Sequence, residues 1–198
     1  MTSLRRKPAA LMLSVAVTCV ASVGAQEAPL VLEVRGGVAA PLGSFSNGAR
    51  VGEGAAPGPS FGVDFVLPGA GRRSFYVGFS QHRFGCADAG CPSDEPYVAT
   101  GFHAGYRIAL LMNRSIFPWI RVAVVTTRVE TDGLGGSNTG VSELGFGGEL
   151  GVGVYIGSAS PVAINPGVRL AAVNTMLPGG ELLRMRYLVA DVAIALAF

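Results

Sequence analysis

The sequence is poor in charged residues and contains almost no lysine. Charged residues make up 14% of the 198 residues, against about 25% in an ordinary soluble domain. Fourteen arginines accompany a single lysine, Lys7. No basic run is left beyond the first residues, which argues against a nucleic acid as the partner. A chain with 49% hydrophobic residues and so few charges is unusual for a water-soluble domain.

Long hydrophobic runs are missing beyond the N-terminus. The stretch "MTSLRRKPAALMLSVAVTCVASVGAQ" joins a basic start to a short apolar run and small residues, which predicts a secretory signal peptide cut after Ala25. As a membrane anchor this run would be short, because a spanning helix needs about 20 apolar residues. We therefore expect residues 1–25 to be removed and residues 26–198 to form one domain. Cleavage would change the formal net charge from +2 to −1, because three basic residues and no acid are lost.

Cysteine and histidine are scarce. Cys19 falls within the predicted signal peptide, and the segment "GCADAGC" holds Cys86 and Cys91. Secreted compartments are oxidising, so these two residues are predicted to form a disulfide. The alternative is a metal site that adds His82 as a third ligand, but this spacing matches no common zinc motif. We expect neither a metal nor a cofactor.

The sequence is rich in period-two alternation. In "SELGFGGELGVGVYIG" (142–157) one parity is almost entirely apolar, while the other holds glycine, two glutamates and a tyrosine. Such alternation is typical of a strand with one apolar and one polar face. Eight segments show it: 30–40, 59–67, 74–84, 97–110, 116–130, 142–157, 162–173 and 182–198.

The connections between these segments alternate in length. Longer connections at 41–58, 85–96, 131–141 and 174–181 are separated by short ones at 68–73, 111–115 and 157–161. Long loops at one end and short turns at the other are typical of outer-membrane barrels. The predicted fold class is all-β, an eight-stranded antiparallel up-and-down transmembrane β-barrel with both termini at the short-turn end. Hydrocarbon requires such a closed barrel with an apolar outer band.

The polar faces are predicted to line the lumen. An eight-stranded barrel leaves room inside for little more than side chains, which suits glycine, alanine and serine. Unpaired buried charges would cost several kcal/mol each, so acids and arginines should pair there. The predicted lumen charge network is Glu33, Arg35, Asp64, Arg121, Glu149, Arg169 and Asp191, with Glu143 and Arg107 on the same face. The opposite assignment, a soluble lipocalin-like barrel, would expose a face of bare glycines and crowd bulky residues inside.

A nucleophilic site is the sharpest catalytic alternative. Ser80 and His82 share one face of a predicted strand, and Asp64 lies on the neighbouring one, so the three residue types of a catalytic triad are present. Their parity points inward, whereas a lipid substrate would arrive from outside. We expect Ser80, His82 and His103 to belong to the polar lumen and the chain not to be an enzyme.

The two ends of the predicted barrel carry a family resemblance. The alternating C-terminal segment ending in Phe198, and the first strand leading to "GVAAPLGSF" (37–45), resemble the small eight-stranded outer-membrane β-barrel family of Gram-negative bacteria over residues 29–198. The resemblance implies an integral outer-membrane protein surrounded by outer-membrane lipid and lipopolysaccharide. It implies that the barrel-insertion machinery reads four terminal residues: Val192, Ile194, Leu196 and Phe198. Candidates for aromatic girdles are Tyr97, Tyr106, Phe117 and Trp119, the last of which has lumen parity.

Three functions remain open at this point. The first is a structural or surface-interaction protein with a lumen filled by side chains. The second is a narrow porin-like channel for small or apolar solutes, and the third is an enzyme that modifies lipid A. The sequence names no ligand, and we expect a monomer.

Overall fold

The computed structural model describes residues 30–47, 54–86, 97–110, 116–132, 139–157, 162–177 and 180–198. The predicted signal peptide, residues 1–25, lies outside these ranges and stays a prediction. Within the described ranges, no helix has the length and apolar character needed to cross a membrane.

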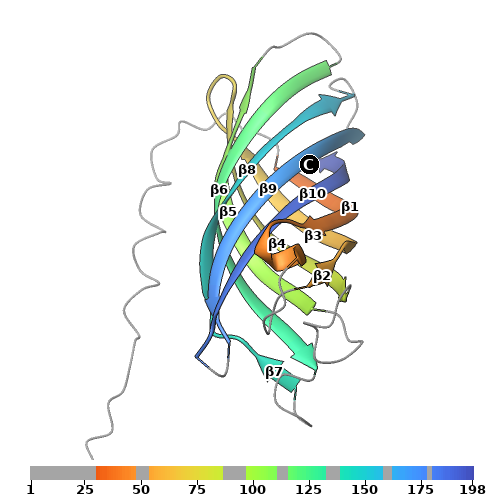
Figure 1. Ribbon diagram of the computed structural model, residues 1–198. Coiled ribbons are helices and arrows are strands. Elements are labelled where there is room, and N and C mark those ends of the chain that lie inside the picture. Colours follow the sequence, from red (N-terminus) through yellow and green to blue (C-terminus); the bar gives the residue numbers. More distant parts are fainter. Residues whose placement is uncertain are drawn as a thin grey trace, which may run out of the picture.

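Eight long antiparallel strands close into a barrel (Figure 1). They are β1 (Val31–Pro41), β3 (Gly58–Pro68), β4 (Arg73–Cys86), β5 (Tyr97–Ala109), β6 (Ile116–Asp132), β8 (Gly145–Ile156), β9 (Val162–Met176) and β10 (Leu182–Ala197). Each strand pairs with the next along the chain, and β10 pairs with β1 from Val31↔Ala197 to Pro41↔Tyr187. This ring of pairings confirms the predicted eight-stranded up-and-down barrel and leaves none of the eight long strands as an edge.

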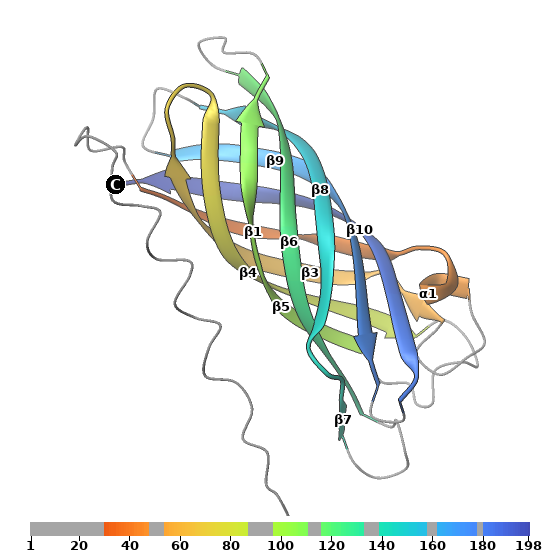
Figure 2. The same cartoon turned by 90° about the vertical axis from the view of Figure 1, so that its left-hand side faces the viewer.

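Three short elements lie at one end of the barrel. They are α1 (Ser44–Asn47), β2 (Ala55–Ala56), which pairs with β4, and β7 (Thr139–Val141), which pairs with β6. Figure 2 shows the C-terminal end of β10 at the opposite end from α1 and β7. We call the end with α1 and β7 the loop end, and the end with the C-terminus and the connections 69–72, 110–115 and 157–161 the turn end.

Two predicted strand bounds differ from the structure by three residues, and the others differ by at most two. β9 continues to Met176, because residues 174–176 extend its ladder with β10, and the connection to β10 is therefore only 177–181. β8 begins at Gly145 rather than at residue 142. The irregular residues 142–144 break the alternation, so Ser142 is buried and Glu143 is exposed. The predicted lumen position of Glu143 was therefore wrong.

Outward side chains form an apolar band. Leu150 and Val152 are 63% and 57% exposed, whereas Glu149, which precedes Leu150, is 5% exposed. Among the side chains that the structure describes on the eight long strands, outward charges occur only near strand ends: Arg73, Arg83, Arg128, Glu130, Arg184 and Arg186. An outer surface free of charge between its two rims is what a bilayer core requires.

Site-directed spin labels on β10 test this band. We expect a nitroxide at Val192 to be accessible to oxygen dissolved in the acyl chains, because Val192 is exposed on the outer face. A nitroxide at Glu181, just beyond the loop end of β10, should instead be accessible to a water-soluble nickel reagent. Accessibility of the Val192 label to the nickel reagent in folded protein in vesicles would contradict the lipid-facing assignment.

Candidate functional site in the lumen

Six charged side chains from six strands meet at the middle of the lumen. Strand alternation points each of them inward, and each is at most 8% exposed. They contribute three guanidinium groups and three carboxylates, so the cluster has no formal net charge. The six are Arg35 from β1, Asp64 from β3, Arg121 from β6, Glu149 from β8, Arg169 from β9 and Asp191 from β10.

The six side chains form one closed ring in which acids and arginines alternate. The contacts run from Arg35 Nη2 to Asp64 Oδ1 (2.9 Å), Asp64 Oδ2 to Arg121 Nη1 (3.2 Å), Arg121 Nη2 to Glu149 Oε1 (2.5 Å), Glu149 Oε2 to Arg169 Nη1 (2.9 Å), Arg169 Nη2 to Asp191 Oδ2, and Asp191 Oδ2 to Arg35 Nη1 (3.4 Å). Every carboxylate therefore bridges two arginines, and every arginine bridges two carboxylates. We call these six residues the charge ring.

The remaining two strands, β4 and β5, contribute side chains that contact the charge ring. His103 on β5 donates a hydrogen bond from Nε2 to Asp64 Oδ1 at 2.6 Å. Tyr76 on β4 lies beneath Arg121, whose guanidinium carbon is 4.4 Å from the centre of the phenol ring. A cation over an aromatic face is attracted by the negative charge of that face. All eight strands therefore contribute to the middle of the lumen.

Glycines make room for the charge ring. Gly151 lies in register directly between Arg121 and Arg169, and a Cβ there would be 2.9 Å from the Cγ of both arginines. Gly78 lies in the same way between Asp64 and His103, where a Cβ would overlap the Asp64 carboxylate. The glycines on the inner wall thus create the space that the long charged side chains occupy.

A second polar cluster lies nearer the turn end. Arg107 on β5 holds Glu33 on β1 through two hydrogen bonds of 2.6 and 2.7 Å, and paired bonds of this kind are among the stronger ones in proteins. Asn165 donates to Glu33 Oε1 at 3.2 Å and accepts from Trp119 Nε1 at 2.7 Å. Glu33 therefore lies apart from the charge ring, although the two sets were predicted as one network.

The cavity that opens at the turn end stops at this second cluster. It has a volume of about 220 Å³, and both Glu33 and Arg107 line it. Trp119 lines it as well and is only 4% exposed. Trp119 is thus an interior residue, as its parity indicated, and not part of a membrane girdle.

The lumen at the loop end is filled by apolar side chains. Phe45 of α1 is fully buried, with ring centroids 5.0 Å from Phe84 and 6.0 Å from Tyr97. Met185 and Tyr187 of β10 belong to the same buried cluster. We call these five residues the loop-end plug. The sequence did not predict this plug, because Phe45 lies in a segment of small polar residues and Tyr97 was expected only in an aromatic girdle.

The structure does not assemble a catalytic triad. His82 Nδ1 is hydrogen-bonded to Ser60 Oγ at 2.8 Å, and Asp64 is bonded to two arginines and His103. Ser80 is buried on the same strand as His82. Asp64 and His82 thus have different partners, and in the described part of the chain no hydrogen bond joins either of them to Ser80.

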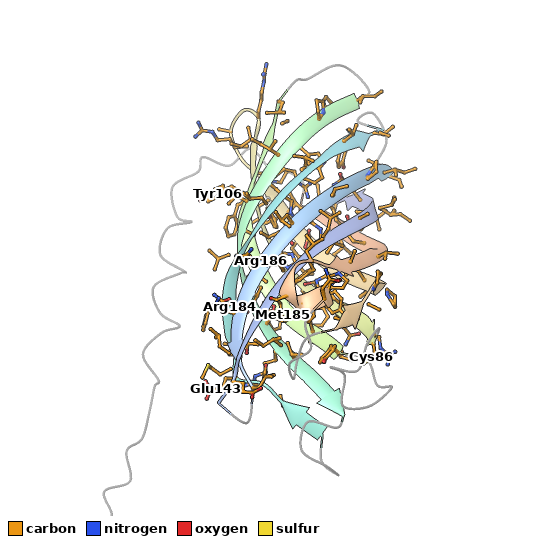
Figure 3. The ribbon with its side chains drawn as sticks, viewed as in Figure 1. Cys86, Tyr106, Glu143, Arg184, Met185 and Arg186 are labelled. Atoms are coloured by element: carbon orange, nitrogen blue, oxygen red, sulfur yellow. The ribbon has the colours of Figure 1, made fainter. Side chains whose placement is uncertain are left out.

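One cysteine of the predicted disulfide lies on β4. Cys86 is the last residue of β4 (Figure 3), and Cys91 lies outside the described residues. The Cys86–Cys91 disulfide and the metal alternative with His82 both stay predictions. In the described ranges, no group of three or more His, Cys, Asp or Glu side chains could hold a metal ion.

The predicted insertion signal lies on the outer face of β10. Val192, Ile194 and Phe198 are 50%, 54% and 72% exposed, and Leu196 is half-buried. Of the girdle candidates not already placed in the interior, Tyr106 is exposed on the outer face and Phe117 is half-buried.

Solved structures show the same fold. Neisserial surface protein A matches with a TM-score of 0.67 and 14% identity, over 85% of this chain and 97% of that chain. The N-terminal β-barrel domain of Pseudomonas aeruginosa OprF matches with a TM-score of 0.50 and 7% identity, again over 85% and 97%. No protein-family model matches the sequence, and no curated protein matches it significantly. The resemblance to small eight-stranded outer-membrane β-barrels is therefore confirmed at the level of the fold.

Removing one carboxylate tests the charge ring. In the variant Glu149→Gln, Arg121 and Arg169 would lose their shared partner, and a buried charge left unpaired costs about 3–5 kcal/mol. We expect unfolding at a clearly lower urea concentration. The migration of the unheated protein on SDS gels measures the folded fraction at each concentration. The control is Glu143→Gln, which removes an exposed glutamate six residues away and should change the stability by less than about 0.5 kcal/mol. Equal effects of the two substitutions would contradict the ring.

Proposed function

We propose that the chain is an integral outer-membrane protein whose lumen is closed by its own side chains and whose role is structural or surface-interacting. The observation that carries this proposal is the closed charge ring, which joins six strands across the middle of the lumen. In this proposal the signal peptide is cleaved, the turn end faces the periplasm and the loop end faces the outside.

Three successive layers support a closed lumen. From the loop end, a solute would first meet the loop-end plug, then the charge ring, and finally the pair of Glu33 and Arg107. Opening the second or third layer would break charge-assisted hydrogen bonds in a buried environment, where an unpaired charge costs several kcal/mol. A passing ion offers no compensation, because each carboxylate of the ring already bridges two arginines.

A narrow channel is the second candidate. The apolar loop-end plug favours it, because an apolar solute could take the place of Phe45 among Phe84, Tyr97 and Tyr187. Such a solute would then face the charge ring, which offers it no apolar path towards the turn end. The closed lumen is therefore the better supported reading.

An enzyme that modifies lipid A has less support. The inward residues Ser80 and His82 are 5% and 2% exposed, and they face the lumen rather than the lipid.

We also propose a role in biogenesis for the outer face of β10. The barrel-insertion machinery would read its four terminal outward residues, Val192, Ile194, Leu196 and Phe198. We also propose that the protein is a monomer.

Conductance in planar lipid bilayers tests the closed lumen. We expect the wild-type protein to insert without producing steady single-channel steps, because each of the three layers blocks the passage of ions. A wide porin inserted under the same conditions serves as the positive control for detecting conductance. Reproducible steps of constant size from the wild-type protein would favour the channel instead.

Mass spectrometry of lipid A tests the enzymatic alternative. We expect identical lipid A masses from bacteria that express the chain and from the same strain without it, because the described residues place Ser80 and His82 in the lumen and assemble no triad around them. The variant Ser80→Ala serves as the control for any change that does occur. A new lipid A species that the wild-type chain produces and Ser80→Ala does not would replace the structural role with an enzymatic one.

A further inference from the structure

We propose that the outer face of β10 and an adjoining furrow in the barrel wall bind a phosphorylated, acylated lipid, the lipid A part of lipopolysaccharide. Arg184 and Arg186 would hold its phosphates, and the furrow would hold one acyl chain. This inference rests on the outer-membrane placement in the proposed function. It does not depend on whether the lumen conducts.

Arg184 and Arg186 are two adjacent outward positions on one strand. Both side chains are exposed, and no ion pair within the described ranges involves either of them. The nearest acids along the strands lie further towards the loop end. Glu181 precedes β10, and the backbone of Glu143 is bonded to Met176, which is opposite Leu182. In Figure 3, Tyr106, Arg186, Arg184 and Glu143 follow one another from the upper to the lower part of the view.

The two arginines lie where the headgroups of the outer leaflet are expected. The outward apolar row of β10 runs from Leu188 to Phe198. Ten residue steps of about 3.3 Å at a tilt of about 45° span roughly 23 Å, close to the band of about 25 Å in outer-membrane barrels. If Phe198 lies at the inner edge of this band, Leu188 lies at its outer edge. Arg186 and Arg184 then follow immediately beyond the hydrocarbon.

A furrow of about 450 Å³ begins beside Leu188. One of its walls follows five residues that are directly opposite one another on neighbouring strands: Leu188, Leu170, Leu150, Val122 and Tyr106. The other wall includes Val168, Val152, Ile120 and Ile108. Leu188 is ten residues before Phe198, which lies at the turn end. Tyr106 is only three residues before Ala109, where β5 reaches the turn end. The furrow therefore descends from the outer rim towards the turn end, across four strand spacings of about 4.8 Å.

The two features together match the chemistry of one lipid. Guanidinium groups bind phosphate oxygens through paired charge-assisted hydrogen bonds, and alternate residues on one face of a strand are about 6.6 Å apart. Two arginines at this spacing suit a headgroup with more than one phosphate better than a phospholipid with a single phosphate. The apolar furrow starts beside the phosphate-binding residues and so accepts an acyl chain attached to the same headgroup.

Native mass spectrometry of the protein purified from outer membranes into detergent tests the site. The probe is diphosphorylated lipid A, titrated against the wild-type protein and the double variant Arg184→Gln/Arg186→Gln. We expect the apparent Kd of the double variant to be at least about tenfold higher, because several charge-assisted hydrogen bonds are lost. Dephosphorylated lipid A should bind the wild-type protein with a similarly raised Kd.

The matched control is the double variant Arg83→Gln/Arg128→Gln. It removes the same charge from two other exposed outward arginines near the loop end, on β4 and β6, and should leave the Kd within about twofold of the wild type. Unheated samples on SDS gels verify that all variants are folded. An equal loss in both double variants would show a non-specific cationic rim and overturn the proposal. Equal binding of dephosphorylated lipid A or of phosphatidylglycerol by the wild-type protein would overturn it as well.

Discussion

The small interior of an eight-stranded barrel is the constraint on which the rest of the structure depends. Strand alternation sends every second side chain into a space that side chains alone can fill, and there is no room for a hydration shell around a charge. Charges that point inward must therefore satisfy one another. The charge ring does so with three arginines and three acids, each of which contacts two neighbours of opposite sign. Buried pairs of this kind stabilise a fold only when their geometry is good. The ring therefore stabilises the barrel only if the strands pair in the correct register.

The register also explains the abundance of glycine. Long charged side chains need space, and the barrel provides it by placing a glycine directly opposite a charged residue on the neighbouring strand. Gly151 does this for Arg121 and Arg169, and Gly78 does it for Asp64. A slip of one residue would turn the charges towards the lipid and fill the spaces left for them. The inner pattern of glycine and charge and the outer apolar band therefore specify the same register.

Much of the fold could be predicted because alternation is a local signal. The polar parity of each strand correctly indicated which residues face inward, as for Glu149 between Leu150 and Gly148. The prediction failed where alternation stops, since the parity count was carried through residues 142–144 to Glu143. The closure of the ring and the separate position of Glu33 could not be predicted, because they depend on distances across the lumen. The loop-end plug was missed for a similar reason, since only the folded loop brings Phe45 to Phe84.

The use of arginine rather than lysine in the lumen follows from the same geometry. A ring of alternating charges needs cations that can contact two carboxylates at once, and the planar guanidinium group has donors on several sides for this purpose. Arg121 uses Nε and Nη2 for Glu149 and Nη1 for Asp64. An ammonium group has a single charged centre on a flexible stem, and it would have to lie between both acids in a crowded lumen. The same fork of donors suits phosphate at the outer rim, so one side chain meets the needs of both the inner and the outer surface of the barrel.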